Sequence, residues 1–286
     1  MEARSWVYWL RRLFALWGVY ARLDFLLMTR NLRSFIVWAV SDSVMVVAHV
    51  TGMLLLAERF GGVGHWSKPQ VYFLLGYASV VDGVLSLFFS YNVVFISRRL
   101  GRGQFDHTLI QPLPIGLSLL TEGFSPALGL PMLVPGICLV WVALGQLALP
   151  AMGFGWWLLF VVNVVGSVGV IMAFQFAWGS LAFRAPRSAE ELSSSTMSLL
   201  NDLKQYPLDG LSGVILWGFC SILPVGFVAW LPSRALLGMV PMGWGGWITP
   251  LASVCYMGVG IFCFVKGRGY YARVGSQRYS NFGHRC

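Results

Sequence analysis

Charged residues are scarce in this chain. They make up 11% of its 286 residues, whereas hydrophobic residues make up 57% and the mean hydropathy is +0.70. A soluble domain carries roughly 25% charged residues, so this composition excludes an ordinary soluble globule and predicts that lipid covers much of the surface. No hydrophilic block is long enough for a separate soluble domain. We therefore expect one membrane domain.

The motifs of soluble catalysis are also missing. The chain contains no GxxxxGK[ST] phosphate loop, no HExxH and no GxSxG. Its five cysteines form no CxxC pair and no Cys/His spacing typical of a metal site. We therefore expect no catalytic residue, no metal ion and no cofactor in this chain, and we do not expect it to be an enzyme by itself.

Residues 1–33 predict an amphipathic helix rather than a cleaved signal peptide. Six arginines are spread along this segment, and no apolar core precedes a cleavage site. At about 100° per residue, four of the arginines fall on one line, opposite a face of Trp and Leu. A basic, Trp-rich helix of this kind lies in the headgroup plane. We expect an elbow helix, which either serves only as an anchor or also contacts a cytoplasmic partner.

Six apolar stretches follow, each long enough to span a membrane at about 20 residues. They run over 34–57, 70–96, 115–146, 153–183, 209–231 and 247–265. In the third stretch, Pro131 and Pro135 predict a kink or a break.

Residues 231–247 are too apolar for a solvated loop and too rich in Pro and Gly for a span. They predict a re-entrant hairpin on the outer face. The expected fold is an all-α membrane protein: an elbow helix over 1–33, a six-helix transmembrane domain over 34–265, and a basic tail over 266–286.

The positive charges predict the orientation. With the N-terminus inside, the inner segments hold 17 of the 20 Lys and Arg residues, and the outer ones hold only Arg59, Lys68 and Arg234. This bias is the positive-inside pattern. It predicts that both termini and the segments 97–114 and 183–208 are cytoplasmic. We attribute the net charge of +9 to this topology and expect no nucleic-acid partner.

Four ionisable residues fall inside the expected spans. They are Asp42 and His49 in the first, Asp82 in the second and Glu122 in the third. A charge in hydrocarbon costs several kcal/mol, so each should face a partner or a water-filled cavity. Two interpretations remain open: a proton or cation relay, or interhelical pairs that fix the packing.

The expected cytoplasmic segments carry the most specific pattern. Residues 97–114 read SRRLGRGQFDHTLIQPLP, which predicts a turn, a helix of one or two turns, and a stop at the prolines. A short helix lying across the inner membrane face could transmit a movement of a cytoplasmic motor protein to the spans. The alternative is a plain connecting loop.

Two stretches of the chain resemble a known family. RGQFDHTLIQPLP, residues 102–114, is similar to the cytoplasmic loop of ABC-2-type permeases of a six-span subgroup. Residues 206–238 resemble a second signature of that subgroup, in which Tyr206 and Pro207 lead into a span with an internal proline, Pro224, and then an outer turn with Pro232. One departure is Gln111, which stands where the family commonly has Arg.

The resemblance implies an exporter in the bacterial cytoplasmic (inner) membrane. It would consist of this permease, a second copy or a homologous permease, and two separate ATP-binding-cassette ATPase subunits that hold ATP and Mg. The segment 98–113 would be the coupling helix, and 183–208 would give a weaker contact through Glu190, Glu191 and Lys204. The residues implied in the first contact are Arg98, Arg99, Arg102, Phe105, Asp106, Leu109, Gln111 and Pro112.

Two other function classes stay open on the residues alone. An ion-coupled secondary transporter would use the four intramembrane residues Asp42, His49, Asp82 and Glu122 and would need no ATPase. A non-transporting membrane scaffold, or a membrane enzyme, is the other class. The sequence does not specify the transported substrate.

Overall fold

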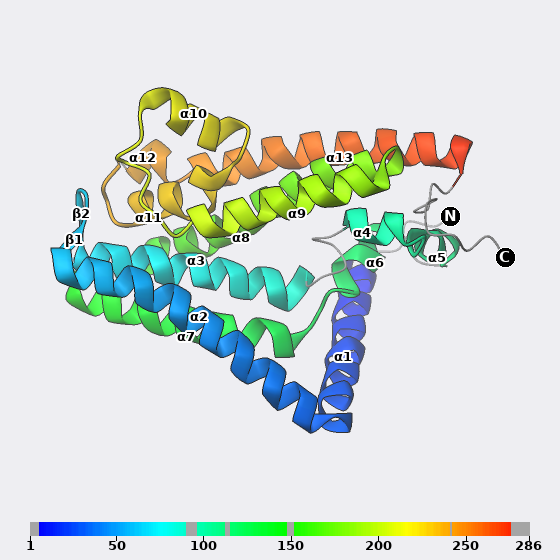
Figure 1. The fold of residues 1–286 in the computed structure, drawn as a ribbon, viewed down its shortest axis with the longest axis horizontal. Coiled ribbons are helices and arrows are strands. Elements are labelled where there is room, and N and C mark those ends of the chain that lie inside the picture. The colour runs from blue at the N-terminus through cyan, green and yellow to red at the C-terminus, as the bar shows by residue number, and fades with distance from the viewer. Residues whose placement is uncertain (1–5, 90–95, 112–114, 148–151, 241, 276–286) are drawn as a thin grey trace.

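The computed structural model describes the chain except for residues 1–5, 90–95, 112–114, 148–151, 241 and 276–286. Side chains at several positions of α2, among them Asp42 and His49, also lie outside the described set. Over the described residues the chain is helical apart from one antiparallel hairpin, in which β1 (Gly62–Val63) pairs with β2 (Trp66–Ser67) (Figure 1). The prediction of an all-α fold is confirmed in this coarse form.

The N-terminal half contains one helix lying across the molecule, two long helices and three short helices. α1 (Trp6–Arg30) is followed after a single residue by α2 (Leu32–Phe60), and α3 (Lys68–Phe89) follows the hairpin. The short helices are α4 (Ile96–Gly101), α5 (Phe105–Ile110) and α6 (Ile115–Thr121).

The C-terminal half contains four long helices and a set of shorter pieces. The long ones are α7 (Pro126–Gln146), α8 (Phe154–Gly179), α9 (Pro186–Leu203) and α13 (Ile248–Val274). A 3-10 turn, η1 (Ser180–Phe183), extends α8. Between α9 and α13 lie α10 (Gly213–Ser221), the π-helical turn η2 (Gly226–Trp230), α11 (Leu231–Leu236) and α12 (Met242–Gly245).

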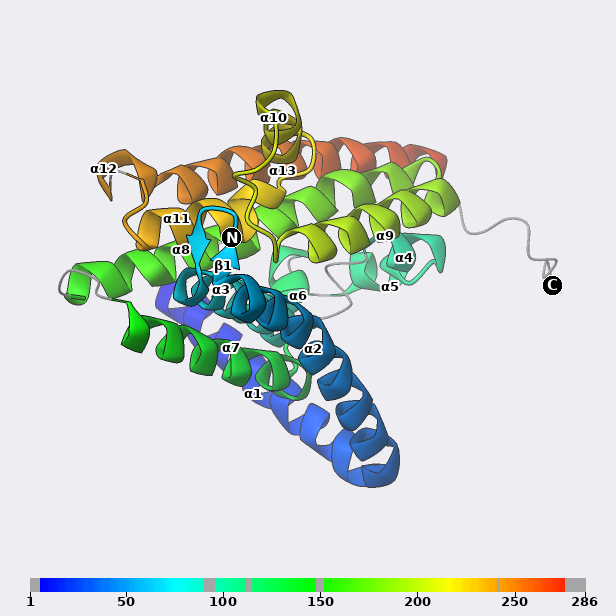
Figure 2. The same ribbon diagram turned by 60° about the vertical axis from the view of Figure 1, so that its left-hand side comes forward.

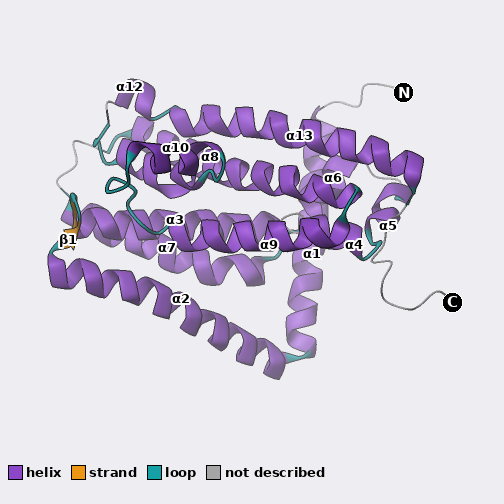
Figure 3. Ribbon diagram, turned by 45° about the horizontal axis from the view of Figure 1, so that its top comes forward, coloured by secondary structure: helices purple, strands orange, loops and turns teal. Residues whose placement is uncertain are grey.

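The long helices lie roughly along one common axis, whichever way the chain runs in each (Figures 1 and 3). The molecule therefore has two ends along this axis. One end carries the β hairpin with α10, α11 and α12, and we call it the hairpin end. The other carries α4 and α5, and we call it the α5 end. In Figure 1, α1 lies across this direction, as an elbow helix would.

Four helices with described residues are long and apolar enough to cross a membrane: α3, α7, α8 with η1, and α13. A fifth candidate is α10 with η2 and α11, but this pair is bent by 83°, the shape of a broken span or a re-entrant loop. The expected spans 70–96, 153–183 and 247–265 correspond to α3, α8 and α13. The expected span 34–57 lies within α2, where part of the side chains are not described.

Three expected boundaries were wrong. The third span does not begin at 115, because α6 ends at Thr121 and α7 begins at Pro126. Proline suits the first turn of a helix, whereas α7 continues through Pro131 and Pro135 without ending. The fifth span, 209–231, is not one helix, and the bent shape expected over 231–247 occurs over Gly213–Leu236. The segment 183–208, expected as a loop, is mostly the helix α9.

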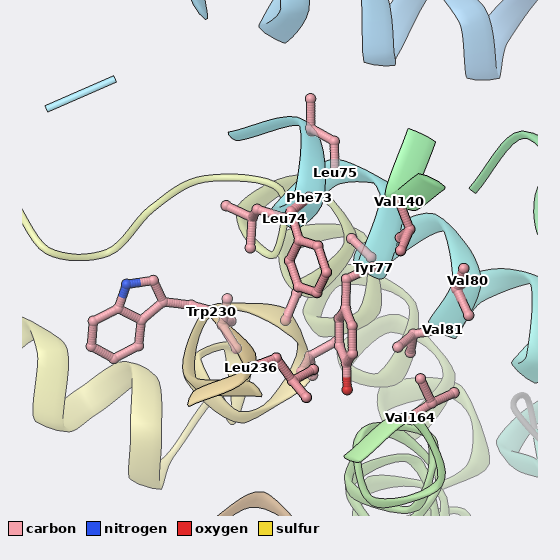
Figure 4. Close-up of a cluster of buried hydrophobic side chains, with 14 of the residues drawn as sticks. Phe73, Leu74, Leu75, Tyr77, Val80, Val81, Val140, Val164, Trp230 and Leu236 are labelled. Carbon is pink, nitrogen blue, oxygen red and sulfur yellow. The ribbon is translucent and has the colours of Figure 1, made fainter. Parts of the chain in front are cut away.

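The core lies where α3 packs against α7 and α8 (Figure 4). Phe73 and Tyr77 of α3 are fully buried, and the Tyr77 hydroxyl and the Ser167 hydroxyl of α8 are 3.0 Å apart. Glycines bring α3 and α7 into backbone contact. A Cβ at Gly83 would lie 2.6 Å from the Cα of Leu133, and one at Gly136 would lie 2.8 Å from the backbone nitrogen of Val80. Such close approach at small residues is typical of membrane helix pairs.

α1, the helix expected to form the elbow, is attached to the start of α7. The Asp24 carboxylate accepts hydrogen bonds from the Ser125 hydroxyl at 2.9 Å and from the backbone N–H of Ala127 at 3.1 Å. It therefore caps the N-terminus of α7, where unpaired N–H groups favour an acidic partner. Trp17 stacks on Phe124 with ring centroids 5.4 Å apart. α1 is thus held on the bundle by a polar and an aromatic contact.

Candidate functional site

The segment expected to couple to an ATPase forms two short helices at the α5 end. α4 ends at Gly101, and Gly103 has φ of +70°, a left-handed conformation that glycine adopts without strain. α5 then runs for six residues, and Gln111 leaves it in an extended conformation. The turn, the short helix and the stop predicted from the sequence are therefore present. Pro112 lies outside the described residues.

Phe105 anchors α5 to the chain's own helices. Its side chain is fully buried, and its ring lies 5.6 Å from Phe183, 6.0 Å from Phe264 and 6.2 Å from Tyr271 between centroids. The hydroxyl of Tyr271 also donates a hydrogen bond to Asp106. Phe105, which the resemblance implies as a contact with the ATPase, therefore offers no surface to a partner in this conformation, whereas Leu109 of the same helix is exposed.

Residues other than Phe105 form the exposed surface of α5. Ile110 is 80% exposed and Leu109 is 40% exposed. The polar residues exposed around them are Arg102, Gln104, His107 and Gln111. The sequence reasoning missed Ile110 and His107, although Ile110 is the most exposed apolar side chain of this helix. The sequence of a six-residue helix does not by itself decide which of its sides faces the bundle.

Arg98 and Arg99 of α4 bind two different parts of the molecule. Arg99 pairs with Glu122 at 2.8 Å and donates to the Thr108 hydroxyl of α5 at 3.0 Å. The Arg99 and Glu122 side chains are only 13% and 12% exposed. Arg98 pairs with Glu190 of α9 at 2.9 Å. α4 therefore connects α5, the turn between α6 and α7, and α9 through polar and charged contacts.

The elbow helix also reaches this network. Burial raises the pKa of the Tyr20 hydroxyl of α1, and the nearby Glu122 carboxylate raises it further. Glu122 is therefore close enough to α1 to influence a group there, and the charged contacts of α4 extend to the elbow.

An open polar cleft lies between α4 and α9. It has a volume of about 480 Å³ and is lined by Arg98, Arg102, Arg187, Glu190, Glu191, Ser194 and Ser195. Among the described residues, no three His, Cys, Asp or Glu side chains come together in a way that could hold a metal ion. The cleft therefore presents a polar surface of three arginines, two glutamates and two serines.

The intramembrane residues fall into two sets. Asp82 of α3 forms an ion pair with Lys204, whose ammonium also donates to the Asn201 side chain at 2.8 Å. Lys204 is 2% exposed and Asp82 is 26% exposed. Glu122 is paired with Arg99, as described above, but its expected place inside the third span was wrong, because it lies in the turn between α6 and α7, outside the candidate spans. Asp42 and His49 lie in α2, and the structure does not describe their side chains.

A second polar cluster lies at the hairpin end. The Asp209 carboxylate accepts from the indole N–H of Trp230 at 2.8 Å and from that of Trp66, and it lies 3.2 Å from Arg234. A carboxylate with two N–H donors and a guanidinium is well compensated for its partial burial. The sequence reasoning gave no role to Asp209, because its three partners are distant in the chain.

The residues of the second signature surround this cluster. Pro224 lies at the break of the 83° bend, and Pro232 is buried in α11. Tyr206 is 46% exposed and lines a hollow of about 400 Å³ beside the hairpin and Trp66, and Pro207 follows it. These prolines and the tyrosine therefore shape the hairpin end, and they lie far from α5.

Three comparisons with known proteins bear on the identity of the chain. A family model described as "ABC-2 family transporter protein" matches residues 43–275. No curated protein and no solved structure matches the chain. The matched region covers most of the chain and includes α3, the coupling segment, the bent pair and α13. The chain therefore belongs to the ABC-2 family of transporter proteins, as a membrane component with transmembrane helices.

Proposed function

We propose that this chain is the permease subunit of an ATP-binding-cassette exporter. It forms the substrate pathway with a second copy or a homologous permease, and two separate ATPase subunits drive it from the α5 end. The observation that carries this proposal is α5 itself, a short helix outside the candidate spans that is anchored inward by Phe105 and presents Leu109 and Ile110 outward. An apolar pair exposed on a short helix suits helix-in-groove docking.

The contacts of α5 would allow it to transmit a displacement from an ATPase to the other helices of this chain. Phe105 packs against Phe183 at the end of α8 and against Phe264 and Tyr271 of α13. Through Thr108, Arg99 and Glu122, α5 is also joined to the turn between α6 and α7. A displacement of α5 would therefore reach two candidate spans directly, α8 with η1 and α13. Transport would then be a shift between two packings of these helices rather than bond chemistry in this chain.

The Lys and Arg distribution supports a cytoplasmic position for the α5 end and for both termini. Arg98, Arg99 and Arg102 lie at this end, and Lys266, Arg268 and Arg273 lie in the last turns of α13, which ends there (Figure 1). An ATPase in the cytoplasm would then meet α5 and the neighbouring Glu190 and Glu191. Lys204 would not take part in this contact, because it is buried against Asp82.

The secondary-transporter alternative has less support. A relay needs groups that can gain and lose a proton or cation. Asp82 and Glu122 are each held beside a basic side chain, at Lys204 and Arg99 respectively. These two residues therefore suit interhelical pairing better than a relay, and they leave the alternative resting on Asp42 and His49.

The experiment is co-purification of the tagged chain from its native membrane. We expect an ATPase with a phosphate loop to co-purify with the unaltered chain and to be lost from the variant Leu109→Ala/Ile110→Ala. A central anchor contributes about 2 kcal/mol or more, so the loss of even one of the two should lower the affinity roughly 30-fold or more.

The matched control is Leu130→Ala/Val134→Ala. These α7 side chains are also exposed, at 48% and 53%, but they lie on a candidate span. Retention of the ATPase by the α5 variant, with unchanged substrate-stimulated ATP hydrolysis, would contradict docking at α5. Absence of any ATPase from the unaltered chain would favour the secondary transporter.

A further inference from the structure

The polar cleft of about 480 Å³ lies at the α5 end, between α4 and the first turns of α9. Ile96 at the start of α4 packs on Gly179 in the last turn of α8, and α9 begins at Pro186, shortly after η1 ends at Phe183. Figures 1 and 2 show α4 beside these first turns of α9. The cleft therefore lies beside the end of a candidate span, at the depth where lipid headgroups meet water.

The cleft carries charges of both signs. Arg98 and Arg102 of α4 and Arg187 of α9 line it together with two carboxylates. One of these, Glu190, is paired with Arg98 at 2.9 Å. The side chains of Arg102, Arg187 and Glu191 are exposed. The cleft thus presents guanidinium groups from two helices and a second carboxylate from α9.

A phosphate group suits the basic side of the cleft. A guanidinium can donate two parallel hydrogen bonds to a phosphate. Arg187 lies in the first turn of α9, where the helix dipole also favours an anion. An anion alone does not suit the whole cleft, because the exposed carboxylate of Glu191 would repel it. A ligand that carries both a phosphate and an ammonium group matches both sides.

Exposed apolar side chains follow the cleft along α9. Leu192 is 43% exposed, and Leu199, seven residues later, is 42% exposed. Seven residues make nearly two turns, so the two leucines lie on one side of α9, about 10 Å apart along its axis. At its end, α9 pairs through Lys204 with Asp82 inside the candidate span α3. The leucines therefore lead from the cleft into the depth of the membrane, where an acyl chain could cover them.

We propose that the cleft binds the headgroup of a membrane phospholipid that carries both a phosphate and an amine. Arg102 and Arg187 donate hydrogen bonds to the phosphate, and Glu191 accepts one from the ammonium. An acyl chain of the same lipid lies along Leu192 and Leu199. This chain forms the site by itself, and only its position in the cytoplasmic leaflet rests on the proposed function.

Native mass spectrometry of the full-length chain, purified in detergent without an ATPase, tests the site. Dioleoyl phosphatidylethanolamine, which carries both groups, and dioleoyl phosphatidylglycerol, which has no amine, are titrated separately. We expect the unaltered chain to bind phosphatidylethanolamine more tightly. Arg102→Gln/Arg187→Gln should weaken the binding of both lipids about tenfold or more, because charge-assisted hydrogen bonds are lost. Glu191→Gln should remove the preference for the amine.

The matched control is Arg268→Gln/Arg273→Gln. These arginines of α13 are also exposed at the α5 end, but they do not line the cleft. Equal weakening in the control and in Arg102→Gln/Arg187→Gln would overturn the site, because it would show a general effect of charge. A preference for phosphatidylethanolamine that persists in Glu191→Gln would overturn the ammonium contact. Elution of each variant at the position of the unaltered chain in size-exclusion chromatography confirms that it is folded.

A second arm distinguishes a lipid from a soluble phosphate ester. We expect Leu192→Ser/Leu199→Ser to weaken the binding of phosphatidylethanolamine. Soluble glycerophosphoethanolamine should displace the lipid only at a far higher concentration, because it has no acyl chain. Displacement at equal concentration, together with unchanged binding in the leucine variant, would overturn the assignment to a lipid.

The cleft could instead belong to the surface that meets an ATPase. Unchanged binding of both lipids by Arg102→Gln/Arg187→Gln, together with loss of a co-purified ATPase, would show this and overturn the lipid site. Lipid binding is measured on the chain alone. Failure of any ATPase to co-purify with the unaltered chain would therefore contradict the proposed function and leave the lipid site unaffected.

Discussion

The pair of Lys204 and Asp82 provides a quantitative test of how α9 is held. Lys204 lies at the end of α9, is 2% exposed and donates both to Asp82 of α3 and to Asn201. Replacing Lys204 by Met keeps the length of the side chain and removes the charge. Asp82 then keeps its negative charge in a largely enclosed site without its cation.

The expected loss follows from the burial of the two partners. Removing one member of a fully buried pair costs about 3–5 kcal/mol. Because Asp82 is 26% exposed, water recovers part of this loss, and we expect a loss of about 2–3 kcal/mol. Unfolding of the purified chain in mixed micelles with rising SDS would measure it. The double variant Asp82→Asn/Lys204→Met should recover part of the loss, because no unpaired charge remains.

Two outcomes of these unfolding measurements would contradict the pairing of Lys204 with Asp82. If Lys204→Met unfolds at the same SDS fraction as the unaltered chain, Lys204 is not buried against Asp82. If the two single losses simply add in the double variant, the side chains do not interact. Either result would remove a main contact that places α9 against α3.

Three further predictions concern packing and charge. Phe105→Ala should lower the stability of the chain itself by about 3–5 kcal/mol, because its ring is enclosed by aromatic side chains; unchanged unfolding would contradict this anchoring role. Gly136→Leu should abolish folding, measured by size-exclusion chromatography, whereas Gly145→Leu on the same helix should be tolerated because no atom lies within 4 Å of its added Cβ. The hydrogen bond from Lys68 lowers the pKa of Glu58, which lies just beyond the expected span 34–57. The pair therefore stabilises the fold above the ordinary carboxyl pKa, and this contribution is lost as the pH falls through the lowered value. The stability difference between the unaltered chain and Glu58→Gln should vanish in acid, and a difference that grows in acid would refute the assignment.

The spans that composition identifies are those whose own residues are almost all apolar. α3, α8 and α13 follow from this rule, since lipid and core both accept apolar side chains. The short helix at 105–110 also followed from local signals, namely a glycine turn before it and prolines after it. Such features are encoded within a few residues, and a single sequence is enough to predict them.

The features that were missed depend on contacts between distant residues. α9 has too many serines and charges for hydropathy, and its place depends on Arg98, Gln175 and Asp82, which belong to three other helices. The inward direction of Phe105 depends on Phe183 and Tyr271, about 80 and 170 residues away. The cap that Asp24 gives to α7 likewise joins the elbow to a distant helix. No periodicity within a segment encodes these partners.

The close packing of α3 against α7 could be predicted from the sequence only in part. The seven-residue spacings of Gly76 with Gly83 and of Gly129 with Gly136 are visible in the sequence. Because small residues line many membrane helix interfaces, the spacing alone indicates an interface. The partner helix becomes known only when Gly83 meets Leu133 and Gly136 meets Val80.

Site-specific photo-crosslinking in cells is the most direct test of an ATPase docked at α5. A benzophenone amino acid at Ile110, which is 80% exposed, should crosslink to an ATP-binding-cassette ATPase. The same amino acid at Trp244, which is 85% exposed and lies in α12 at the hairpin end, should not. Crosslinking of the ATPase at Trp244, or its absence at Ile110 in a chain that transports, would contradict the account.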